Sequence, residues 1–244
     1  MSMAIWRLLL VGLFTTPLLA RSPDEILKRL GSDEFATRQA MSAALLTDDT
    51  LTEETLAELY AAAQTVEQRH RLMDVARHHL YRSIRKKIDQ PTDKGSIGIR
   101  PDGLSAKYIP HVGRSAIVVV DTLPGFPAYG QLLPGDLLLT VDGRKLPQNA
   151  QERQLTAAFV NSIQAKHPGQ LIRLAVRRGQ TTKNVSLEMA SLKALQSIYP
   201  QNRPIGLGLS EPVQHQWEEH RKRLLVLSKT RKMFRIERVP ATTD

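Results

Sequence analysis

Apolar residues recur at helical spacing throughout residues 22–90. Ser22 followed by Pro23 is typical of a helix start, because the Ser oxygen accepts a first-turn N–H and Pro suits the first helical position. Four successive helices are predicted, the longest over residues 66–87. In that helix, one face carries Leu72, Val75, Ala76, Leu80 and Ile84. The pattern predicts a small helical bundle.

Beyond a polar segment at residues 89–94, the pattern changes to that of short strands. Residues 116–120 form a β-branched run, and residues 137–141 an apolar run between two tight turns. Pro127 suits the first turn of a short helix between these runs. A longer helix at residues 154–166 and two further strands are predicted to follow.

Residues 191–244 form a basic C-terminal segment that is predicted to contain one helix, over residues 213–227. From Trp217 to Arg238 there are eight Lys or Arg residues against three Glu. The preferred interpretation is a helix docked on the preceding domains. A helix that binds a membrane surface or a partner is the alternative.

The first 20 residues have the pattern of a secretory signal peptide. Arg7 provides the positive start, residues 8–19 are apolar, and residues 17–20 form a plausible cleavage region. An uncleaved anchor or a buried helix are the alternatives. The chain has no Cys, which excludes disulfides, thiol catalysis and thiolate metal sites. The predicted location is therefore the periplasm or cell envelope, or the medium after secretion.

In a cytosolic protein, the formal net charge of +10 would indicate nucleic acid as a partner. An export signal makes nucleic acid an unsuitable partner. A solvated basic surface is the preferred explanation. Weak contact of the basic tail with an anionic envelope surface is the functional alternative.

The sequence Gly95-Ser96-Ile97-Gly98-Ile99, the strand at residues 116–120 and the Pro134-Gly135-Asp136 turn occur in the order found in PDZ domains. Residues 94–190 resemble the PDZ domain of HtrA-like periplasmic proteases, without the protease domain. Residues 30–40 more weakly resemble the start of HEAT-like helical repeats. The resemblances imply an α+β chain: a HEAT-like helical bundle, a PDZ-like partly open β-barrel with two helices, and a C-terminal helical tail.

The PDZ resemblance implies a peptide-binding groove, in which a peptide is added as a strand to a sheet edge. Its carboxylate loop and the start of the receiving strand would be Ser96, Ile97, Gly98 and Ile99. The facing helix would contribute Leu155, Phe159, Val160 and Ile163. Such an apolar pocket implies a ligand that ends in Val, Leu, Ile, Phe or Ala. Pro101 has no N–H for a ladder, so the receiving edge is expected to be short, with residues 104–114 as an excursion over the groove.

Enzymatic interpretations find little support in the sequence. The segment before the PDZ-like region is too short and too helical for a Ser-His-Asp protease domain. His70, Asp74 and His78 lie four apart on one predicted helix and are a conceivable metal site. The crowding of Arg residues around them favours a solvated helix surface instead. No catalytic residue, metal or cofactor is predicted.

The preferred hypothesis is therefore an exported, non-enzymatic adaptor that captures C-termini or extended segments of other proteins. The alternative is a regulatory or substrate-delivery subunit of a separate envelope protease. An unassigned enzyme that uses His70, Asp74 and His78 is the third hypothesis.

Overall fold

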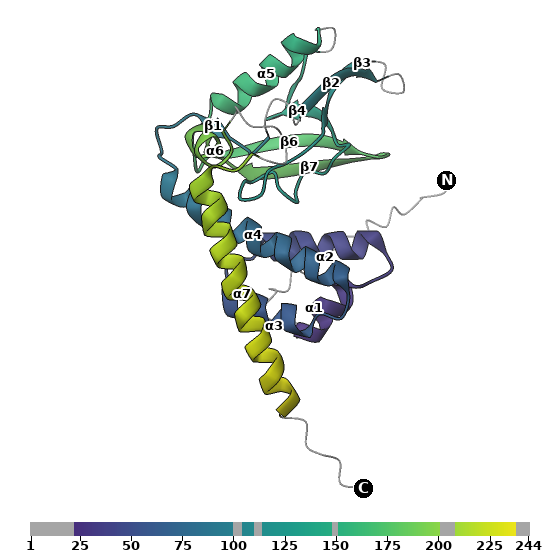
Figure 1. The fold of residues 1–244 in the computed structure, drawn as a ribbon. Coiled ribbons are helices and arrows are strands. Elements are labelled where there is room, and N and C mark those ends of the chain that lie inside the picture. Colours follow the sequence, from purple (N-terminus) through teal and green to yellow (C-terminus); the bar gives the residue numbers. More distant parts are fainter. Residues whose placement is uncertain (1–21, 100–103, 110–113, 148–150, 201–207, 238–244) are drawn as a thin grey trace, which may run out of the picture.

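The computed structural model describes residues 22–99, 104–109, 114–147, 151–200 and 208–237 (Figure 1). The predicted signal peptide at residues 1–20 lies outside the described residues. In the described part, no helix combines the length and the apolar character needed to cross a membrane.

Four helices form the N-terminal helical module: α1 (Pro23–Leu30), α2 (Phe35–Thr47), α3 (Glu53–Ala62) and α4 (Val66–Ile88). Side chains cap three of their starts: the Ser22, Thr52 and Thr65 hydroxyls each accept a backbone N–H of the first turn. Their inward faces make one aliphatic core. That core includes Leu30, Met41, Leu45, Leu59, Leu72 and, from the C-terminal helix, Leu224.

A six-stranded antiparallel sheet follows, with β2, β3, β4, β6 and β7 in spatial order and β5 paired with β4. The bounds of these strands are β2 (Leu104–Ile109), β3 (Arg114–Val119), β4 (Leu137–Val141), β5 (Arg144–Lys145), β6 (Leu171–Arg178) and β7 (Thr181–Glu188). Helix α5 (Glu152–Gln164) packs against β2 and β3. A separate pair, β1 (Gly95–Ser96) and β8 (Ala190–Ser191), joins the beginning and the end of this region.

Asp136 holds the turn that precedes β4. Its side chain is only 1% exposed, and Arg178 of β6 donates to both carboxylate oxygens over 2.7 and 2.6 Å. One of these oxygens also accepts the Leu133 N–H. A buried carboxylate is tolerated here because charged and backbone donors satisfy it.

The short helix expected at Pro127 does not form, because the segment consists of successive turns. Gly125 and Gly130 flank it with φ of 86° and 76°, values incompatible with a right-handed helix. The described part of this region therefore contains one helix, α5, where two were expected. The prediction of an excursion at residues 104–114 was also wrong for residues 104–109. These residues form β2 and pair with β3 along their whole length.

The C-terminal segment contains two helices, α6 (Leu192–Ile198) and α7 (Glu211–Glu237), where one was predicted. Helix α7 runs along the helical module and packs against α3 and α4 (Figure 1). Helix α6 follows β8 directly and packs against α4 and β1. The chain thus returns from the sheet to the helical module through α6.

Candidate functional site

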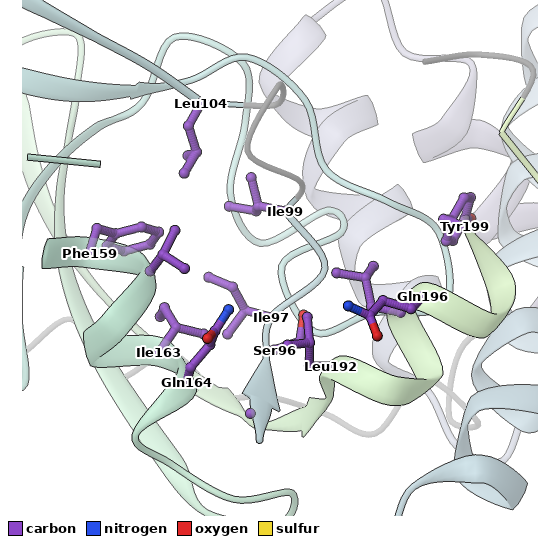
Figure 2. Close-up of a pocket in the computed structure, with 13 residues that line it drawn as sticks. Ser96, Ile97, Ile99, Leu104, Phe159, Ile163, Gln164, Leu192, Gln196 and Tyr199 are labelled. Carbon is purple, nitrogen blue, oxygen red and sulfur yellow. The ribbon is translucent and has the colours of Figure 1, made fainter. Parts of the chain in front are cut away.

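A cavity of about 60 Å³ lies beside the loop that follows β1, between α5 and α6 (Figure 2). None of its described lining residues is charged, and most are apolar. One buried water needs about 10–15 Å³ of such space, so the cavity has room for roughly four waters. The lining residues are Gly95, Ser96, Ile97, Ile99, Leu104, Phe159, Val160, Ile163, Gln164, Leu192, Leu195, Gln196 and Tyr199.

Helix α5 forms one wall of the cavity. Phe159 and Ile163 lie four residues apart and are 2% and 6% exposed, so they present one buried face toward the loop. Val160 lines the rim and is half-buried. Leu155 lies on the same helix face but is fully buried in the sheet core and does not line the cavity.

The loop Ile97-Gly98-Ile99 forms the base of the site. Its carbonyls are engaged on one side: Ile97 O accepts the Ala128 N–H and Gly98 O accepts the Leu123 N–H, each over 2.9 Å. The Gly98 N–H donates to the Ser96 hydroxyl over 3.2 Å. Among the described residues, the Ile97 and Ile99 N–H groups have no acceptor. The loop therefore combines tethered carbonyls with amide donors that are available to an anion.

Gly98 is required by this loop for two reasons. Its φ of 84° lies in the left-handed region, which residues with a Cβ adopt only at an energetic cost. A Cβ at this position would also lie 2.0 Å from the Cβ of Phe126. Gly98 does not line the cavity itself; it lets the loop pass close to Phe126.

Ser96 is the last residue of β1, and its backbone pairs with Ala190 of β8. Its backbone is therefore already paired within the chain, and its hydroxyl faces the loop. Among the described residues, the strand next to α5 that has a free edge is β2, which is one of the two outer strands of the six-stranded sheet. The residues between the loop and β2 include Pro101 and lie outside the described part.

Comparison with known proteins agrees with this geometry. Residues 95–189 match the PDZ domain family. This segment is a PDZ domain. It contains the loop and α5, and it ends immediately before β8 and α6.

Solved structures similar to the chain include the HtrA-type protease AlgW with a decapeptide, at 26% sequence identity and a TM-score of 0.32. That match covers 41% of this chain and 30% of the protease chain. A variant of the same protease with a tripeptide has 26% identity and a TM-score of 0.30, over 41% and 32% of the two chains. The chain thus corresponds to about a third of the length of these proteases. A search of curated proteins found no match.

The second wall of the cavity lies outside the PDZ domain, in α6. The cavity is lined by Leu192, Leu195 and Gln196 of this helix and by Tyr199 directly after it. Sequence reasoning missed all four, because it ended the domain at residue 190 and expected no helix before residue 213. The spacing of Leu192, Leu195 and Tyr199 at i, i+3 and i+7 is the signal that could have revealed the helix.

Helix α6 is fixed at both ends. At its start, the Leu192 N–H donates to Lys94 O over 2.7 Å, and the Ser191 hydroxyl caps the helix by accepting the Ala194 N–H. At its end, the Tyr199 hydroxyl donates to Pro124 O over 3.0 Å. The second wall is therefore built into the contact between the PDZ domain and the helical module.

The buried cluster at this contact, here called the junction core, consists of Tyr81, Ile84, Leu123, Phe126, Ala190, Ala194, Leu195, Ile198, Tyr199 and Val213. Polar groups are also buried at this contact. His78 of α4 is 5% exposed, accepts the Gly125 N–H at Nδ1 over 3.0 Å, and stacks on Tyr129. Burial, followed by the charges of His79, Arg82 and Arg85, lowers the pKa of His78 to about 3. Burial raises the pKa of Tyr81 to about 12 and that of Tyr199 well above its ordinary value. The histidine is thus neutral and both phenols are protonated at neutral pH.

The conceivable metal site on α4 does not assemble. His70 is exposed, Asp74 pairs with Arg77 over 2.6 Å, and His78 turns inward to Gly125. In the described part of the chain, no three His, Asp or Glu side chains come together to hold a metal ion. The expectation of a solvated surface was wrong for His78, because sequence spacing could not show that the PDZ domain packs on this face of α4.

Proposed function

We propose that this protein is an exported, non-enzymatic adaptor that binds the C-termini or extended segments of other polypeptides in its PDZ groove. The observation that carries the proposal is the apolar cavity beside the Ile97-Gly98-Ile99 loop, together with the two loop amides that have no acceptor among the described residues. A terminal carboxylate would accept hydrogen bonds from these amides, and the last side chain of the ligand would enter the cavity. Backbone pairing along the free edge of β2 would hold the preceding residues.

Export and the adaptor role rest on further features. The N-terminal charge and apolar pattern supports passage through a secretory route. The helical module offers a surface separate from the groove, as an adaptor requires. The basic C-terminal tail would make at most weak contact with an anionic envelope surface, and nucleic acid is not a proposed partner.

The decisive experiment compares peptides with a free C-terminus and the same peptides amidated, on protein that comprises residues 21–244. We expect binding of free peptides by fluorescence polarisation and a loss of about tenfold or more on amidation, because charge-assisted hydrogen bonds are lost. Equal binding of both forms would contradict a carboxylate-reading groove. Absence of binding by every free peptide would overturn the proposed function.

A pair of substitutions on α5 localises the binding. Val160→Glu places a charge on the rim of the cavity, whereas Ala157→Glu places the same charge on an exposed position of the same helix. We expect Val160→Glu to weaken peptide binding by about tenfold or more, since the carboxylates of ligand and variant repel each other and the apolar rim is lost. Ala157→Glu should bind like the wild type. Equal effects of both variants would place the peptide elsewhere.

A further inference from the structure

Helix α6 completes a site that the PDZ domain alone leaves open on one side. Figure 2 shows Leu192 and Gln196 of α6 on one side of Ser96, with Ile163 and Gln164 of α5 on the other. The terminal residue of a bound peptide would therefore lie between α5 and α6. Leu192 is the first residue of α6 and is half-buried at the cavity wall.

The α6 wall has little freedom to retreat from a larger ligand. Ser191, immediately before Leu192, is fully buried; its N–H donates to Asp89 Oδ1 over 2.9 Å, and its hydroxyl caps α6. The opposite face of α6 carries Ala194 and Ile198, both fully buried in the junction core. Movement of α6 would break these hydrogen bonds and open that core.

The space between the two walls is small. A cavity of about 60 Å³, room for roughly four waters, matches an aliphatic side chain of up to three carbon atoms and not an aromatic ring. Phe159 and Ile163 are almost fully buried on the α5 side and are part of the sheet core, so they cannot yield space either.

We infer that α6 restricts the ligand to polypeptides with a small aliphatic C-terminal residue, Ala or Val, and that Leu192 is the residue that sets this limit. This inference rests on the proposed function and deepens it. It narrows the ligand from the range that the PDZ domain alone would admit, because one wall of the terminal pocket comes from a helix that follows the domain.

The test uses one peptide body with a free C-terminal Ala, Val, Leu or Phe, measured by fluorescence polarisation. Wild-type protein should bind the Ala and Val peptides about tenfold or more tightly than the Phe peptide, with Leu between, since a filled pocket discriminates by about tenfold or more per excess methylene. Leu192→Ala should widen the pocket and raise the affinity for the Leu and Phe peptides about tenfold. Leu192→Phe should narrow it, retain Ala and reject Val.

Lys193→Ala is the matched control, because Lys193 neighbours Leu192, is exposed and does not line the cavity. Its peptide ranking should equal that of the wild type. If free peptides bind but the ranking favours Phe, or if both Leu192 variants keep the wild-type ranking while remaining folded by thermal melting, the inference fails and the proposed function stands. If the wild type binds no peptide, the proposed function fails and the inference fails with it.

Discussion

The core of the PDZ domain and the junction core are built from different kinds of residue. The PDZ core has Phe159 as its one aromatic residue among the described residues, and a single contiguous segment, residues 97–189, supplies all of it. The junction core gathers aromatic rings from four distant segments: Tyr81 of α4, Phe126 of the turn, Tyr199 after α6 and Trp217 of α7. It also contains the buried cation Arg85, over the ring of Phe126.

The difference shows how the two walls of the cavity are supported. The PDZ core stabilises the loop and α5 through many interchangeable aliphatic contacts. The junction core stabilises α6 through a few directional contacts, in which a hydroxyl, an imidazole and backbone groups each have one partner. The second wall of the pocket therefore depends on the helical module, and single changes in the junction core are expected to be costly.

The largest expected effect is that of Gly125→Ala. A Cβ at Gly125 would lie 2.5 Å from the Cβ of Tyr81 and 2.8 Å from its carbonyl carbon, at a φ of 86°. Because backbone as well as side chain blocks the new atom, we expect a loss of about 3 kcal/mol or more in the free energy of unfolding, measured by urea denaturation.

Gly135→Ala provides the control for this change. Gly135 has a φ of 90° but nothing within 4 Å of the added Cβ, so the substitution costs only the backbone strain, about 1–2 kcal/mol. Equal losses at Gly125 and Gly135 would show that the junction core does not resist the added atom.

The next effect is a pH dependence that originates from His78. Its pKa is about 3 in the folded protein and about 6.5 in the unfolded chain, so only the unfolded chain gains the proton between these values. This contribution to stability is full above pH 6.5 and declines as the pH falls from 6.5 to 3. It amounts to a loss of about 2 kcal/mol at pH 5.

His78→Asn removes the titration and retains an acceptor that can reach the Gly125 N–H. We expect the free energy of unfolding of this variant to vary less between pH 7 and pH 5 than that of the wild type, by about 2 kcal/mol. His70→Asn, at an exposed position of the same helix, should keep the wild-type pH dependence. An unchanged profile in His78→Asn would contradict the assignment of the effect to His78.

The smallest effect concerns the Tyr199 hydroxyl. Tyr199→Phe removes the hydrogen bond to Pro124 O and leaves that carbonyl without this donor, so stability should fall by about 1 kcal/mol in urea denaturation. Tyr60→Phe is the control, because Tyr60 is half-buried and its hydroxyl has no hydrogen-bond partner among the described residues. Its stability should stay within about 0.5 kcal/mol of the wild type.

Local sequence patterns predicted most of the helices and strands of the PDZ domain and of the helical module. The caps at Ser22 and Thr52 mark the starts of α1 and α3, and the β-branched run near residue 118 marks β3. The expected helix at Pro127 failed because two glycines with positive φ outweigh the local preference of Pro. Helix α6 was missed because it has only seven residues, so its periodic signal is limited to the spacing of Leu192, Leu195 and Tyr199.

The sequence alone determined the elements whose stability is local, because spacing and turn chemistry act over a few residues. Tertiary structure alone decided that α6 becomes the second wall, that His78 is buried and that Tyr199 meets Pro124. The physical reason is distance along the chain, because these contacts join residues tens of positions apart. No local pattern encodes which side chains lose their contact with water when the elements pack together.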